Sequence, residues 1–133
     1  MTLNEELVAI EAAVSECEKE IASGKISVES DVRQIKSIAD PQARIAKLGE
    51  ITAVHMKRID TLNIERLTGL KLQNPNNARI AELGRKAAKC YLTLMRHGLS
   101  TSEELSPPER KPQLQALHEE AMVSMKMTLN HLL

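Results

Sequence analysis

The sequence predicts an all-α protein: a helical bundle of four to five helices with a central antiparallel helical hairpin. Leu, Ile, Val and Met recur at the three- and four-residue spacings of a helix face along most of the chain. There is no Phe or Trp and one aromatic residue, Tyr91, so the core must be aliphatic. An aliphatic core suits packed helices better than strands. The 133 residues are expected to form a single helical domain.

Residues 1–23 are expected to form an acidic amphipathic helix with a heptad pattern typical of coiled coils. Its apolar residues follow one another at spacings of 4, 3, 4, 3 and 4: Leu3, Leu7, Ile10, Val14, Cys17 and Ile21. Gly24 can end this helix by adopting the left-handed conformation. We expect Leu3, Leu7, Ile10 and Val14 to form an exposed seam that docks on another protein or on a second copy.

Residues 27–72 form a basic segment that is expected to hold two helices. Ser27 is suited to cap the first of them, and Asp40-Pro41 is a cap followed by proline at the first helical position. His55 lies on the apolar stripe of the second helix, where a polar residue can fix the register of packing. Asn74-Pro75 is a turn, so the helices on its two sides form the central hairpin.

The second half of the chain is expected to contain a basic helix, a connector and a last amphipathic helix, over residues 75–97, 98–111 and 112–133. Gly98 is expected to end the basic helix in a Schellman-type cap, with Arg96 and His97 complementing the helix dipole. Met122 and Met125 are candidates for a second protein-docking patch, because Met side chains repack easily.

Charge is distributed unevenly along this neutral chain. Residues 1–31 hold eight acidic and two basic side chains (−6), residues 32–99 hold five and thirteen (+8), and residues 100–133 hold five and three (−2). The acidic first helix can cover the basic segment inside the molecule, or the basic segment can bind nucleic-acid phosphates. The candidate nucleic-acid contacts are Lys57, Arg58, Arg79, Arg85, Lys86 and Lys89.

No catalytic, cofactor or metal motif is found by spacing. Arg96-His97-Gly98 resembles the signature of histidine phosphatases, in which the His attacks phosphorus. That family places the motif near its N-terminus and needs a second His far downstream, whereas only 35 residues (133 minus 98) follow Gly98. The cysteines, Cys17 and Cys90, and the four histidines show no local metal-ligand spacing. We therefore expect no catalytic residues, no cofactor and no metal, and we expect both cysteines to be core residues.

The leading functional prediction is a non-catalytic helical protein–protein interaction module, such as a small adaptor, chaperone-like or regulatory subunit, that forms a homo-oligomer. The alternative is a nucleic-acid-binding helical protein that uses residues 32–99, such as a phage or plasmid DNA-processing component. The hairpin around Asn74-Pro75 resembles the central hairpin of phage small-terminase subunits. The chain has no apolar run long enough for a membrane helix, no secretory signal pattern and only two cysteines, so we expect a cytoplasmic protein without membrane contact.

Overall fold

The computed structural model describes residues 1–133 and contains α-helices but no strand. The helices are α1 (Leu3–Ala22), α2 (Val28–Lys36), α3 (Pro41–Thr61), α4 (Ile64–Gln73), α5 (Ala78–Leu105) and α6 (Lys111–Thr128), with a short 3-10 helix η1 (Pro108–Arg110) before α6. The predicted all-α bundle is confirmed. None of its helices has both the length and the apolar character needed to cross a membrane.

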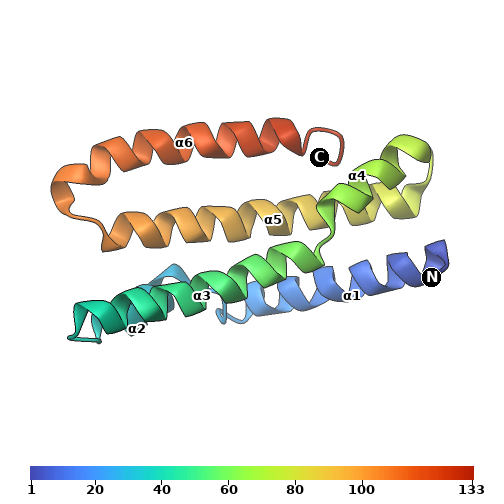
Figure 1. Ribbon diagram of the computed structural model, residues 1–133. Helices are drawn as coiled ribbons and strands as arrows, with labels where there is room; N and C mark the ends of the chain where they lie inside the picture. The colour runs from blue at the N-terminus through green and yellow to red at the C-terminus, as the bar shows by residue number, and fades with distance from the viewer.

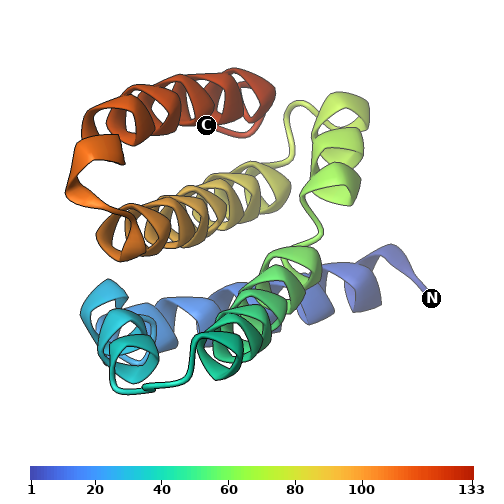
Figure 2. The ribbon, with the colours of Figure 1, turned by 60° about the vertical axis from the view of Figure 1, so that its left-hand side comes forward.

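Helix α5 is the centre of the bundle, because it packs against each of the five other α-helices. Helix α6 lies along one side of α5, and α1, α2 and α3 lie on the opposite side (Figures 1 and 2). Helix α4 packs against α5 across the Asn74-Pro75 turn, as the hairpin prediction requires. The side of α6 that faces away from α5 has no covering helix.

The helix starts follow local capping signals in the sequence. Thr2 and Glu5 form a capping box at the start of α1. The side chains of Ser27, Asp40 and Asn77 accept backbone N–H groups at the starts of α2, α3 and α5. Gly24 follows α1 with a φ of 77°, which confirms the predicted left-handed stop.

The core is aliphatic and includes the seam of α1, which corrects the expectation that this seam is exposed. Leu7, Ile10 and Val14 are no more than 3% exposed, and only Leu3 at the end of the seam is exposed. The seam is covered because α1 packs against α5 and α3 of the same chain. Leu7, Ile10 and Val14 therefore stabilise the fold and are not available to a partner in the folded protein.

Two helix boundaries also differ from the sequence prediction. Helix α5 continues through Gly98 to Leu105, so Gly98 is not a cap and the connector is much shorter than expected. Gly98 lacks the positive φ of a helix-ending glycine, and Thr101 beyond it is buried, so tertiary packing extends the helix. In the other half, Asn63 adopts a left-handed φ of 52° and divides one expected helix into α3 and α4. Asn is one of the few non-glycine residues that tolerate this conformation.

Candidate functional site

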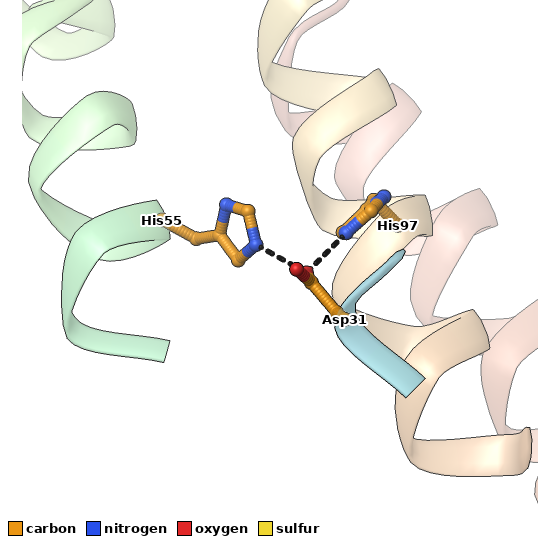
Figure 3. A group of neighbouring side chains, drawn as sticks. All are labelled: Asp31, His55 and His97. Atoms are coloured by element: carbon orange, nitrogen blue, oxygen red, sulfur yellow. Dashed lines mark hydrogen bonds and ion pairs between the residues drawn. The ribbon is translucent and has the colours of Figure 1, made fainter. Parts of the chain in front are cut away.

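A cluster of three polar side chains lies inside the bundle: Asp31 from α2, His55 from α3 and His97 from α5 (Figure 3). Oδ2 of Asp31 lies 3.0 Å from Nε2 of His55 and 2.8 Å from Nε2 of His97. The two imidazole rings meet edge to face, with their centroids 4.9 Å apart. Asp31 and His97 are each 7% exposed. A buried carboxylate therefore joins two histidines at the junction of three helices.

Each member of the cluster occupies a position where helical periodicity places a core side chain. Asp31 precedes the buried Ile35 by four residues, and His97 follows the buried Leu94 by three. His55 lies one turn before the partly buried Ile59 on the inner side of α3. Burial of such polar groups is costly unless they are hydrogen-bonded, and these three satisfy one another.

Arg58 and Glu20 extend the cluster into a network that reaches α1. Nη1 of Arg58 donates to Nδ1 of His55 at 3.1 Å, and Nε of Arg58 donates to Oε2 of Glu20 at 2.6 Å. Because Nδ1 of His55 accepts a hydrogen bond, the ring proton is assigned to Nε2, which donates to Asp31. One chain of contacts therefore runs from Glu20 through Arg58, His55 and Asp31 to His97 and links four helices.

The cluster borders a solvent-open pocket of about 230 Å³. Asp31, His55 and Arg58 line this pocket together with Lys25 and Lys47, whereas His97 does not line it. The three donor atoms of the cluster all lie within 4.8 Å of one another. Two imidazoles and one carboxylate converging in this way are chemically able to hold a metal ion or to relay a proton.

Sequence reasoning identified His55 and His97 but did not bring them together, and it missed Asp31. His97 is a buried member of the cluster, so its interpretation as a helix-ending basic residue is wrong. Asp31 is separated by 24 residues from His55 and by 66 from His97, so no local motif connects them. The available signal was an acidic residue on the apolar stripe of α2, between Val28 and Ile35.

The basic residues proposed as nucleic-acid contacts are divided between paired and unpaired side chains. Arg58 pairs with Glu20 and Arg79 with Glu11 of α1, each at 2.6 Å. The hydrogen bond from Arg79 holds the pKa of Glu11 below its usual value. Lys86 pairs with Glu82 on its own helix. The remaining candidates are exposed and have no acidic side chain within ion-pair distance: Lys57, Arg85 and Lys89.

A third pair, Arg66 with Glu6 at 2.9 Å, adds to the contacts between α1 and the basic segment. Glu6, Glu11 and Glu20 are spread along the whole length of α1. The acidic helix therefore covers part of the basic segment inside the molecule. These pairs reduce the number of cations that are free to meet phosphates.

The methionines proposed for docking lie at the boundary between α6 and α5. Met122 and Met125 are both partly buried, so they are only partly available to a partner. The more exposed apolar residues of α6 are Met127, which is 73% exposed, and Leu117 and Val123, which are each 58% exposed. A second group of exposed apolar residues lies on α3, where Ile45 is 71% exposed.

Cys17 of α1 and Cys90 of α5 are free thiols in the core, as predicted. Burial, and then the neighbouring Cys17, raise the pKa of Cys90 to about 12. A thiol with this pKa stays protonated near neutral pH and is a poor nucleophile. Their role is to pack α1 against α5.

No family model, curated protein or solved structure matches this chain.

Proposed function

We propose that this chain is a non-catalytic helical protein–protein interaction module that docks through α3 onto a second copy of itself. The observation that carries the proposal is a stripe of exposed, uncharged side chains along α3, which we call the outer stripe. The outer stripe consists of Ile45, Ala46, Gly49, Thr52, Ala53 and Met56, all of which are exposed.

The outer stripe is distinct from the side of α3 that holds the helix in the bundle. The inner side contains Leu48, His55 and Ile59, which are partly buried against the neighbouring helices. At about 100° per residue, Ile45 and Met56 lie roughly a quarter turn away from that side. A helix that needed only to cover its own core would carry polar residues there, so this surface is suited to contact another protein.

The order of residues in the stripe makes it complementary to itself. Ile45, Gly49, Thr52 and Met56 follow one another at spacings of 4, 3 and 4, with the large side chains at the two ends and the small ones in the middle. In an antiparallel pair, Ile45 of one copy faces Met56 of the other, and Gly49 faces Thr52. The same surface then serves both partners of a two-fold dimer.

The outer side of α6 is a weaker candidate for this dimer. Val123 and Met127 are exposed there, but the charged Glu119 and Glu120 line the same surface. A symmetric pair of α6 helices would bring these carboxylates together, and like charges in contact are destabilising. The outer stripe of α3 itself contains no charged side chain.

The experiment is sedimentation equilibrium or light scattering of the intact chain over a range of concentrations. A single helix pair is a small interface, so we expect a dimer with a dissociation constant on the order of micromolar. Ile45→Glu places a carboxylate in the stripe and should give a monomer. Measured at a concentration below the dissociation constant, its melting temperature should equal that of the wild type, since Ile45 does not contribute to the core. The matched control, Val123→Glu on α6, should remain dimeric.

A wild-type chain that stays monomeric at roughly 100 µM would contradict the proposed dimer, because that concentration far exceeds the expected dissociation constant. Loss of the dimer in Val123→Glu, with retention in Ile45→Glu, would also contradict it and would move the interface to α6.

A further inference from the structure

We propose that Asp31, His55 and His97 form a binding site for a divalent first-row transition metal ion, with Zn²⁺ as the ion that this donor set suits best. The inference does not depend on the proposed dimer, because the cluster lies inside one chain and the outer stripe of α3 takes no part in it. It rests on the geometry of the donors, their burial and an opening to solvent.

The spacing of the donor atoms is close to that of a metal site. Zn²⁺ binds imidazole nitrogen and carboxylate oxygen at about 2.0–2.2 Å, which places neighbouring ligand atoms of a tetrahedral site roughly 3.3–3.6 Å apart. Oδ2 of Asp31 already lies 3.0 Å from Nε2 of His55 and 2.8 Å from Nε2 of His97. A movement of roughly half an ångström would therefore suffice on these two edges, whereas the two imidazole nitrogens, which lie within 4.8 Å of each other, would have to approach by roughly 1 Å.

The donor types select the class of metal. Imidazole nitrogens suit Zn²⁺, Fe²⁺, Ni²⁺ and Cu²⁺, whereas Mg²⁺ and Ca²⁺ prefer sites made of oxygen ligands. Three protein ligands leave at least one coordination position for water. The pocket of about 230 Å³ beside Asp31 and His55 supplies both that water and a route for the ion.

Arg58 is the competitor that the metal has to displace. In the metal-free arrangement its Nη1 donates to Nδ1 of His55, which keeps the ring proton on Nε2. Metal binding at Nε2 moves this proton to Nδ1. The N–H groups of Nδ1 of His55 and Nη1 of Arg58 would then face each other, and neither could accept a hydrogen bond. The guanidinium group of Arg58 lines the open pocket, so it can turn toward solvent when the ion binds.

Bound metal would join α2, α3 and α5, which otherwise meet through hydrogen bonds at this position. Helix α2 has only nine residues and is too short to be stable in isolation. The ion would therefore stabilise the part of the bundle that carries α3 and its outer stripe.

The test is a calorimetric titration of the untagged, chelator-treated chain with Zn²⁺, repeated with Mg²⁺ as the comparison ion. We expect one Zn²⁺ per chain, a rise in melting temperature of several degrees at saturation and no response to Mg²⁺. Asp31→Asn keeps the shape of the side chain but removes the anionic ligand, so it should weaken Zn²⁺ binding by at least about 100-fold. His118→Gln, at a histidine of α6 outside the cluster, is the matched control and should bind as the wild type does.

Arg58→Met separates a metal site from a purely structural hydrogen-bond network. Without the competing guanidinium group, the affinity of this variant for Zn²⁺ should be equal to or higher than that of the wild type. The variant also lacks the hydrogen bond between Arg58 and Glu20. Because buried variants can unfold, the imidazole resonances of the wild-type chain provide a second measurement. Zn²⁺ should shift those of His55 and His97 and leave those of His131 unchanged.

Absence of stoichiometric Zn²⁺ binding to the folded wild-type chain would overturn the proposal. So would equal affinity in Asp31→Asn, or resonance shifts confined to histidines outside the cluster. None of these results bears on the oligomeric state, so the metal site and the proposed dimer can fail independently.

Discussion

Replacement of Gly98 by alanine tests whether α5 continues beyond His97 to Leu105. In the structure Gly98 is an exposed residue inside a helix that ends at Leu105, and a Cβ atom built there meets nothing within 4 Å. Alanine therefore adds no clash and favours the helix by about 0.5–1 kcal/mol. If Gly98 were instead a left-handed cap, alanine would cost about 1–2 kcal/mol.

A helix that continues through Gly98 and a helix that ends there predict opposite signs for the change in the free energy of unfolding, so the test does not depend on a precise magnitude. Urea unfolding followed by circular dichroism should give Gly98→Ala a higher free energy of unfolding, and a melting temperature raised by roughly 2–4 °C. Gly24→Ala is the matched control: its φ of 77° is unfavourable for alanine, so this variant should be destabilised. A destabilised Gly98→Ala would mean that the helix ends near His97, and the extension of α5 to Leu105 would then be wrong.

Three further outcomes follow from the core and its charges. Leu94→Ala should lower the free energy of unfolding by about 2–5 kcal/mol in urea titrations, because Leu94 is 1% exposed. The pKa of Cys90 is about 12 in the folded protein against an ordinary 9.0, so the Cys90 thiol loses its proton at a lower pH in the unfolded chain than in the folded one. The free energy of unfolding should therefore fall as the pH rises from about 9 to about 12. This fall should be smaller in Cys90→Ala. The pKa of Glu11 is lowered by the hydrogen bond from Arg79, so ionised Glu11 should stabilise the fold above about pH 4.5, and this stabilisation should be lost as the pH falls below that value. Glu11→Gln, compared with the wild type at low salt, should lack this pH dependence.

Features that depend on local sequence were predictable. Ser27, Asp40 and Gly24 fixed helix ends through capping chemistry that acts within a few residues. The charge asymmetry also indicated that an acidic helix could cover a basic segment, and the pair between Glu11 and Arg79 is one case. Both kinds of signal can be read from composition and spacing alone.

Features that depend on distant packing were not predictable in the same way. A heptad stripe has the same spacing whether it packs inside its own chain or against another chain, so the burial of Leu7 could not be distinguished from exposure. The helix break at Asn63 required one residue to adopt an uncommon backbone conformation. Asp31 joined the two histidines only after three helices came together, and no spacing rule covers separations of 24 and 66 residues.

The central position of α5 has a consequence for synthesis on the ribosome. Fifty-five residues separate the end of α1 at Ala22 from the start of α5 at Ala78, and α1 reaches its main apolar partner only when α5 has emerged. At roughly 5–20 residues per second this interval lasts several seconds. During that time the leucine and isoleucine side chains of the nascent N-terminal helix are accessible to chaperones or to neighbouring nascent chains, so the emergence of α5 determines when this exposure ends.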